Sequence, residues 1–292
     1  MSGFSADWLR LREPFDAAAR DRELTLGFAA ALKHRQPEQC RIIDLAAGSG
    51  ANFRVLAPLL NVDQDWLLVD CDPALLNAQA EEIVHWSQRE TWRCEKLNQS
   101  ITVHAGMSTW RAHAWSLDLA QTLDQLDFTA CDAVTTTAFL DIVSADWIET
   151  FCQRLVRSQL PLLATLTVDG RRVWTPGHPS DALIEAAFRR HQTRNKGFGP
   201  ALGPLATTQI ANRLSAAGYT VTTMSSDWHV GTMDREMLRR MAEESVAVAL
   251  ETDPSAAALC DDWLAQRATQ IDAGALTLNI GHIDLLALPS AQ

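Results

Sequence analysis

Paired cysteines are missing from this chain of 292 residues. Its six cysteines are scattered singly and form no Cys-x-x-Cys pair. Structural zinc sites and redox motifs use closely spaced cysteines, and disulfide frameworks are typical of small secreted chains. We therefore expect reduced thiols, no disulfide and no metal site.

Long apolar runs are also missing. No stretch of eighteen apolar residues occurs without a charge, and the segment from Met1 to Asp7 lacks the basic and then apolar pattern of a signal peptide. We therefore expect no membrane partner and a cytoplasmic location. With 47% hydrophobic residues, the chain can bury one large core, so we expect a single domain with insertions.

Positive charge is scarce in this chain. The net charge is −11, and basic residues come in pairs at most, such as Arg189-Arg190. A protein that binds nucleic acid needs a basic stripe to neutralise the phosphates. We therefore expect no nucleic-acid partner and favour a small molecule. The sequence leaves open whether the protein is a monomer or a homodimer.

The most informative segment is a glycine turn that follows a short apolar strand. Ile42 and Ile43 precede Asp44, and Gly48 and Gly50 then flank a serine. Glycine lets a backbone adopt conformations that are closed to other residues and lie directly against a ligand. Residues 52–60 carry apolar side chains at helical spacing, so the free N–H groups of a helix should face the turn.

A second acidic residue follows about twenty residues later. The strand expected from Trp66 to Val69 ends in Asp70, where a carboxylate can accept hydrogen bonds from both hydroxyls of a ribose. A dinucleotide-binding turn has a third glycine, but Phe53 stands at that position, which disfavours a dehydrogenase. Taken alone, the glycine turn can also be a simple connection between a strand and a helix.

These segments resemble motifs of a known enzyme family. Asp44 to Gly50 resembles motif I of the class I S-adenosylmethionine-dependent methyltransferases, and Val69-Asp70-Cys71-Asp72-Pro73 resembles the family's second motif. Cys131 to Leu140 resembles its fourth-strand motif. The resemblance implies an α/β fold with a Rossmann-like, mostly parallel sheet of seven strands in the order 3-2-1-4-5-7-6, flanked by helices. It also implies S-adenosyl-L-methionine as cofactor and S-adenosyl-L-homocysteine as product.

The resemblance covers the whole chain and suggests how it is divided. We expect one methyltransferase domain over residues 1–292, made of an N-terminal helical lid (1–38), a cofactor-binding core (39–168), an acceptor-side insertion after strand five (169–205) and the C-terminal part of the sheet (206–292). The lid pattern breaks near Pro14. Ile101 to Ala105 is expected as the third strand, and residues 160–168, 219–224 and 276–288 as later strands.

Most of the expected cofactor site follows from the resemblance. The residues expected to bind the cofactor are Asp44, Ala46, Gly48, Ser49, Gly50, Asn52, Asp70, Cys71, Met107, Ser108, Thr136 and Arg20. Met107 and Ser108 are included because they follow the expected third strand, where many relatives have an acid that binds the adenine amino group. Arg12, Asp16 and Arg20 are four residues apart and share a helical face, so one arginine can hold the methionine carboxylate. A surface ladder of ion pairs is the alternative.

The acceptor site is expected after strand four and in the insertion. Asp141 follows strand four, where it can orient a cationic amine or remove its proton. A helix cap or an ion pair is the alternative role. His178 and His191 are further candidates for catalysis, although a structural or surface role is the favoured alternative for each. The residues expected to line the acceptor are Asn195, Lys196, Phe198 and Trp174.

Three classes of function remain from the sequence. The leading one is methyl transfer to nitrogen, oxygen or carbon of a small molecule. The chain lacks the Asn/Asp-Pro-Pro-aromatic motif of enzymes that methylate amino groups of nucleic acids, and has Thr135-Thr136-Thr137-Ala138 there. A lyase or cyclase that uses the same cofactor, and a regulatory protein that only binds it, are the alternatives.

Overall fold

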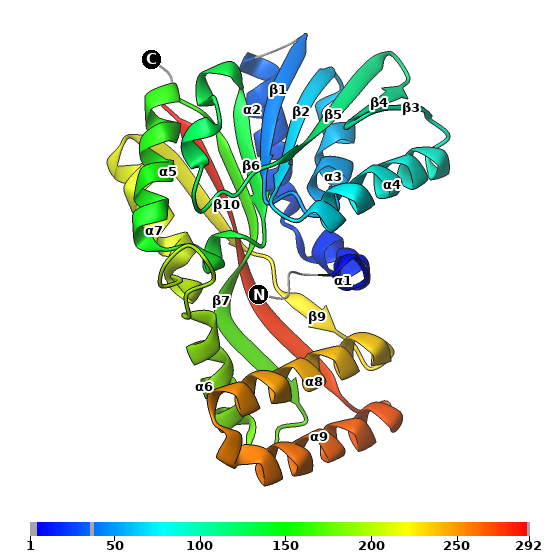
Figure 1. Ribbon diagram of the computed structural model, residues 1–292, viewed down its shortest axis with the longest axis vertical. Helices are drawn as coiled ribbons and strands as arrows, with labels where there is room; N and C mark the ends of the chain where they lie inside the picture. Colours follow the sequence, from blue (N-terminus) through cyan, green and yellow to red (C-terminus); the bar gives the residue numbers. More distant parts are fainter. Residues whose placement is uncertain (1–4, 36–37, 291–292) are drawn as a thin grey trace.

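A mixed sheet of ten strands runs through the described part of the molecule, with helices on both faces (Figure 1). The computed structural model describes residues 5–35 and 38–290. The expectation for Met1 to Asp7 therefore lies mostly outside the described residues. The strands are β1 (Gln39–Leu45), β2 (Asp63–Asp70), β3 (Arg93–Leu97), β4 (Ser100–Ala105), β5 (Ser108–Ser116), β6 (Ala133–Thr137), β7 (Leu162–Thr175), β8 (Tyr219–Ser225), β9 (Trp228–Val230) and β10 (Thr277–Pro289).

Nine α-helices belong to the described ranges. They are α1 (Ala6–Ala19), α2 (Arg22–Arg35), α3 (Ala51–Leu60), α4 (Pro73–Arg89), α5 (Ala145–Ser158), α6 (Asp181–Gln192), α7 (Ala206–Ala216), α8 (Arg235–Thr252) and α9 (Ala257–Asp272). Within residues 5–35 and 38–290, no helix is both long and apolar enough to cross a membrane.

The expected sheet of seven strands in the order 3-2-1-4-5-7-6 is corrected by the structure. The observed order is β3-β4-β5-β2-β1-β6-β7-β10-β8, and β9 pairs with β10. Strands β5, β2, β1, β6 and β7 are parallel to one another, whereas β10 is antiparallel to its neighbours β7 and β8. The additional strands are an antiparallel hairpin at one edge, β3 and β4, and the short β9.

The expected third strand is wrong. Ile101 to Ala105 belongs to β4, which pairs antiparallel with β5, and it is β5 that lies beside β2. Both segments alternate apolar and polar residues, so either fits the pattern of a strand with one buried face. Their pairing partners, which the alternation does not specify, decide the topology.

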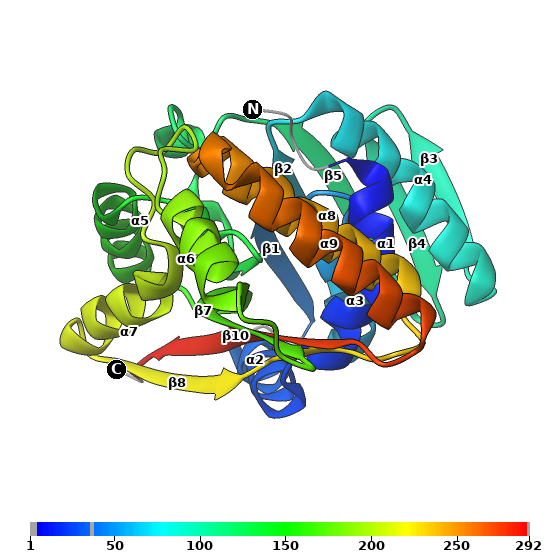
Figure 2. The same ribbon diagram turned by 90° about the horizontal axis from the view of Figure 1, so that it is seen from below.

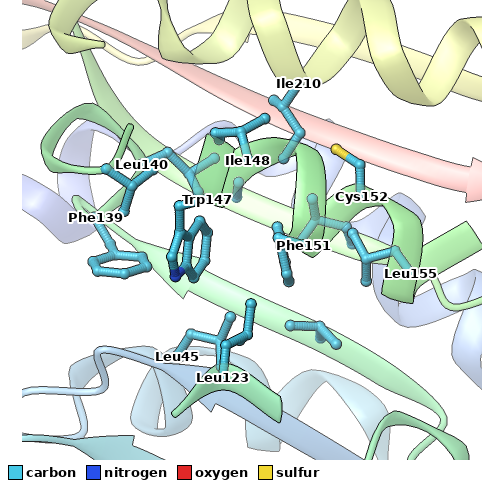
Figure 3. Close-up of a cluster of buried hydrophobic side chains, with 14 of the residues drawn as sticks. Leu45, Leu123, Phe139, Leu140, Trp147, Ile148, Phe151, Cys152, Leu155 and Ile210 are labelled. Atoms are coloured by element: carbon cyan, nitrogen blue, oxygen red, sulfur yellow. The ribbon is translucent and has the colours of Figure 1, made fainter. Parts of the chain in front are cut away.

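Two hydrophobic clusters hold the helices against the sheet. Helices α5 and α7 cover one face, where Figure 3 shows aromatic and aliphatic side chains from α5 packed between the sheet and α7. Helices α2, α3 and α4 contribute to the cluster on the other face. There Phe53 is fully buried, with ring centroids 5.4 Å from Trp66 and 5.8 Å from Trp86. An aromatic ring therefore fills the space that a third glycine would leave between helix and sheet.

Strands β7 and β10 continue far beyond the other strands and carry a second layer of helices, which we call the cap (residues 168–192 and 228–281). Figure 1 shows it below the sheet, and Figure 2 looks onto α8 and α9 from that side. Its core contains Trp174 and Trp263, and the fully buried Arg267 forms an ion pair with Asp181. Helices α8 and α9 were not predicted from the sequence, and β7 continues past Val168, where the fifth strand was expected to end.

The N-terminal segment differs from the expected lid in two ways. Helix α1 continues through Pro14, whose ring is exposed, and the chain bends at Arg20 and Asp21 instead. The bend is stabilised because the Asp21 N–H donates to Asp284 Oδ2 (2.8 Å). Helix α2 buries Leu24, Phe28 and Leu32 in the core, so only α1 has the position of a lid.

Candidate functional site

The glycine turn lies at the carboxyl end of β1, beside the ends of β2 and β6. Gly48 and Gly50 have φ angles of +54° and +77°, which glycine adopts without strain. The Ala47 N–H donates to the Val69 carbonyl (2.9 Å) and ties the turn to β2. Helix α3 starts directly after Gly50, so its first N–H groups face this edge of the sheet.

Asp44 is buried at the base of the turn with one carboxylate oxygen unpaired. Its Oδ1 accepts hydrogen bonds from Asn52 Nδ2 and Thr135 Oγ1, both at 2.8 Å. Its Oδ2 is enclosed and has no hydrogen-bond partner among the residues that the structure describes. Burial raises the pKa of Asp44 to about 6, although the hydrogen bonds and the charge of Arg20 oppose the shift. A buried carboxylate with a free oxygen is suited to a cationic ligand.

Arg20 reaches the same place from the end of α1. Its guanidinium donates to Asn52 Oδ1 (2.8 Å) and to Thr137 Oγ1 (3.3 Å). Its Nε is enclosed and makes no hydrogen bond within the described ranges. Asn52 therefore bridges Asp44 and Arg20, and these three residues form what we call the cradle. An unpaired anionic oxygen near a guanidinium matches the two charges of an α-amino acid.

Asp70 at the end of β2 is held in position by backbone groups. Its Oδ2 accepts the Gly48 N–H (2.8 Å) and its Oδ1 accepts the Asp72 N–H (3.0 Å). An ionised carboxylate has about four acceptor positions, so two bonds leave others for a ligand. Asp72 also caps α4, which begins with Pro73.

Asp118 is a further candidate for this site that was not predicted from the sequence. It follows β5, and the neighbouring Leu117 N–H donates to the Asp70 carbonyl (3.0 Å). Burial, followed by the charges of Asp70 and Asp118, raises the pKa of Cys71, which shows that Cys71 and Asp118 lie at one edge. The missed signal is the alternation of buried Trp110 and Ala112 with polar residues, which marks residues 108–116 as a strand.

Two residues expected at the cofactor site lie elsewhere. Met107 is fully exposed in the turn between β4 and β5, and Ser108 begins β5. Both are therefore at the opposite end of β5 from Asp118. The physical reason is the direction of β5, which runs parallel to β2 and ends beside Asp70.

The remaining residues expected at the turn make internal contacts. Ala46 adopts a φ of +52° within the turn. The Ser49 carbonyl accepts Arg54 Nη1 (2.7 Å), and Thr136 Oγ1 donates to the Leu45 carbonyl (2.9 Å). These contacts fix the shape of the turn and the pairing of β1 with β6.

Helix α1 lies over the glycine turn. A Cβ built on Gly48 would be 3.1 Å from Leu9 Cδ1. Glu13 forms an ion pair with Arg54 (2.6 Å), and none of the residues of α1 is buried. The helix therefore covers the turn through one apolar contact and polar contacts, and a ligand on Gly48 requires Leu9 to move.

Charged residues gather beside the cradle, on the side of α1 that faces the cap. Asp141 is buried after β6, and burial raises its pKa while the charges of Lys196 and Arg12 oppose the shift. Arg12 is paired with Asp16 (2.8 Å) and lies 4.9 Å from the centre of the Trp228 ring. The charges of Lys196 and Arg12 therefore act on the expected Asp141, although no ion pair joins either of them to it among the described residues. We call Arg12, Asp16, Asp141 and Lys196 the charged cluster.

The other residues expected on the acceptor side make structural contacts. Within the cap, His178 Nδ1 accepts the Ser180 N–H (3.0 Å), and Trp174 Nε1 donates to Glu185 (2.9 Å). At the end of α6, His191 lies 3.5 Å from Glu251.

The loop after α6 uses its two remaining candidates to fix its own shape. Asn195 Oδ1 accepts the N–H groups of Gly197 and Gly199. Phe198 packs edge-to-face against Phe139 and Trp147. In the described residues, no group of three or more His, Cys, Asp or Glu side chains could hold a metal ion.

Comparisons with known proteins give only distant structural likenesses. No family model matches the chain, and no curated protein matches it. A methyltransferase from Geobacter sulfurreducens, solved with S-adenosyl-L-homocysteine, is 13% identical with a TM-score of 0.43, covering 96% of this chain and 98% of its own. A cyclopropane synthase from Mycobacterium tuberculosis is 12% identical with a TM-score of 0.44, and the alignment covers 98% of this chain and 87% of that protein.

A third likeness is to an O-methyltransferase family protein from Burkholderia thailandensis. It is 16% identical with a TM-score of 0.46, and the alignment covers 98% of this chain and 59% of that protein. At these values the three likenesses carry no argument about function, which rests on the residues of the site.

Proposed function

We propose that this protein is an S-adenosyl-L-methionine-dependent methyltransferase that acts on a small molecule. The observation that carries the proposal is the cradle. S-adenosyl-L-methionine ends in an α-amino acid, whose ammonium would pair with the unpaired oxygen of Asp44 and whose carboxylate would pair with the guanidinium of Arg20. Both unpaired atoms are enclosed in this structure, so binding requires neighbouring side chains to move. Charges buried without partners are costly, so the two unpaired atoms indicate a ligand of matching charge.

Asp70 supports the nucleoside end of the same cofactor. Its carboxylate keeps free acceptor positions while Gly48 and Asp72 hold it in place, and a ribose supplies two hydroxyl donors. Asp118 follows β5 and its charge acts on Cys71, so it is the candidate for the adenine side of the nucleoside. The backbone of Gly48 allows close approach once Leu9 is displaced.

The cofactor supplies an electrophilic methyl group on a sulfonium sulfur. The protein then has to orient the acceptor, exclude water and hold any proton that the acceptor releases. Helix α1 and the cap helices lie on the side of the carboxyl edge of the sheet (Figure 2), where they would exclude water from a bound acceptor. The charged cluster is the part of the chain that can orient the acceptor, with Asp141 and Lys196 as groups of opposite charge.

The class of partner follows from charge. At a net charge of −11, the protein repels phosphates, which favours a small-molecule acceptor over nucleic acid. Methyl transfer, elimination and cyclisation use the same cofactor site, and the product distinguishes them. S-adenosyl-L-homocysteine identifies methyl transfer, whereas methylthioadenosine indicates a lyase or cyclase.

Calorimetry with S-adenosyl-L-homocysteine tests the proposal. Asp70→Ala removes the acceptor of two ribose hydrogen bonds, so we expect a loss of about 2–3 kcal/mol, or about 30- to 150-fold in Kd. Asp65→Ala is the matched control, because Asp65 belongs to the same strand but lies at its other end. Unchanged affinity of a folded Asp70→Ala protein contradicts the ribose assignment, and no binding by the wild type contradicts the proposed function.

A further inference from the structure

His282 is a buried histidine on β10 that no sequence motif marked. It is 3% exposed, and its Nδ1 lies 3.1 Å from the Ile280 carbonyl oxygen. A carbonyl only accepts hydrogen bonds, so Nδ1 must carry the hydrogen. The lone pair of the neutral ring is therefore on Nε2, which makes no hydrogen bond to any described residue and is absent from the enclosed unpartnered atoms. Nε2 consequently keeps a small solvent-accessible surface.

The surroundings place His282 next to the candidate acceptor side of the site. Its ring lies 5.3 Å from that of Trp228, whose Nε1 donates to Asp16 (3.1 Å). Arg12 packs on the same Trp228 ring. Arg12, Asp16 and Arg20 follow one another along α1, and the eight residue steps from Arg12 to Arg20 correspond to about 12 Å of helix. His282 thus faces the part of α1 that precedes the cradle.

Burial, supported by the charge of Arg12, keeps the ring neutral. Burial lowers the pKa of His282 to about 4, Arg12 adds to the shift, and Asp16 and Asp169 oppose it. Asp227 accepts the His282 backbone N–H (3.2 Å) and is paired with Arg171. An imidazole in this setting is unprotonated at neutral pH and offers Nε2 as an acceptor.

We propose that His282 Nε2 accepts the proton of a hydroxyl or thiol on the acceptor, so that the protein methylates oxygen or sulfur. This inference rests on the proposed function. The oxygen or sulfur forms the new bond to the methyl carbon, the electron pair of the broken carbon–sulfur bond stays on the cofactor sulfur, and the proton passes to Nε2.

The weak basicity of His282 selects this class of acceptor. A hydroxyl or thiol that has received a methyl group is a very strong acid, so even a weak base removes its proton. A methylated amine holds its proton far more tightly, and a tertiary amine has no such proton to donate. Asp16 and Asp169 then stabilise the imidazolium until it releases the proton to water.

The test uses diethyl pyrocarbonate, which modifies unprotonated and accessible imidazole nitrogens, followed by peptide mass spectrometry on the wild-type protein. His282 should be modified, whereas His178, which is also buried, should not be, because its Nδ1 already accepts the Ser180 N–H. N-acetylhistidine in the same tube provides an ordinary imidazole. The rate of modification of N-acetylhistidine should decrease as the pH is lowered below 6.5, while that of His282 stays constant down to about pH 5.

Phenol and anisole serve as probes, because they share a ring and only phenol has an O–H group. We expect phenol to slow the modification of His282 at least about fivefold more than anisole does, because only phenol donates a hydrogen bond to Nε2. The proposal is overturned if His282 is unreactive, if its reactivity decreases with pH in parallel with that of N-acetylhistidine, or if the two probes have equal effects.

The experiment needs no cofactor, so it separates this inference from the proposed function. If S-adenosyl-L-homocysteine binds but His282 fails these criteria, only the inference is wrong. If His282 meets them but S-adenosyl-L-homocysteine does not bind, the methyltransferase proposal is wrong and a hydroxyl-binding site remains.

Discussion

The unpaired oxygen of Asp44 should make the free protein less stable than a variant without that charge. Asp44→Asn keeps the shape of the side chain and its Oδ1, which still accepts from Asn52 and Thr135. The substitution replaces the unpaired Oδ2 with a neutral amide group. The substitution thereby removes a buried charge that has no partner in the free protein. It leaves one amide N–H₂ group without a hydrogen-bond acceptor.

The magnitude follows from the pKa of Asp44, which burial raises from 3.8 to about 6. The folded protein holds this proton more tightly than the unfolded chain does, so stability falls as the pH rises from about 4 to 6 and stays lower above that range. Two pKa units correspond to about 3 kcal/mol. The unpaired amide of Asp44→Asn costs about 1–2 kcal/mol, so the net gain at pH 8 should be about 1–2 kcal/mol.

Thermal and urea unfolding at pH 8 and pH 4.5 measure this gain. We expect a Tm that is about 2–8 °C higher at pH 8 and no gain at pH 4.5. Asp284→Asn is the matched control. Both oxygens of Asp284 already accept hydrogen bonds, so whichever oxygen becomes the amide N–H₂ group will face a hydrogen-bond donor. That variant should lose stability.

Calorimetry should show the opposite effect on binding. Asp44→Asn loses the charge that pairs with the ligand ammonium, so the affinity for S-adenosyl-L-homocysteine should fall about 10- to 100-fold. An Asp44→Asn protein that is no more stable than wild type at pH 8, or that gains equally at both pH values, refutes the reasoning.

Three further predictions concern the turn, the covering helix and the charged cluster. Gly48→Val should lose about 1–3 kcal/mol of stability in urea unfolding, because φ is +54° and Leu9 is adjacent. The variant should also not bind S-adenosyl-L-homocysteine in calorimetry. Normal binding would show that the turn only connects a strand and a helix. Leu9→Ala should speed association of S-adenosyl-L-homocysteine in stopped-flow fluorescence, and an unchanged rate shows that α1 does not control entry. Lys196→Ala should lower acceptor turnover while the cofactor Kd stays within about threefold, whereas His191→Gln, which only loses its contact with Glu251, should leave turnover unchanged.

The glycine turn and Asp70 were predictable because their information is local. A short apolar strand, two glycines and an acid at the end of the next strand are read directly from adjacent residues. Asp118 was not predictable in this way, because it depends on which of two alternating segments pairs with β2. Pairing is decided by packing between distant parts of the chain, which alternation alone does not encode.

The acceptor side was the hardest part to predict. Asp141 and Lys196 were named from their positions after β6 and α6, and the structure brings their charges together. Trp174 and His178 were assigned to the same side because their loop was taken as irregular, whereas β7 continues to Thr175 and carries them into the cap. The environment of His282 depends on α1, which lies about 270 residues earlier in the sequence.

The position of α1 has a consequence for how the two proposed sites communicate. Leu9 and Arg20 touch the glycine turn and the cradle, while Arg12 packs on Trp228 at the start of the cap. Cofactor and acceptor would therefore leave the site by the same route, past α1. Movement of this one helix would then limit both dissociation rates, so a mutation that loosens it should speed the release of S-adenosyl-L-homocysteine and of the methylated product together.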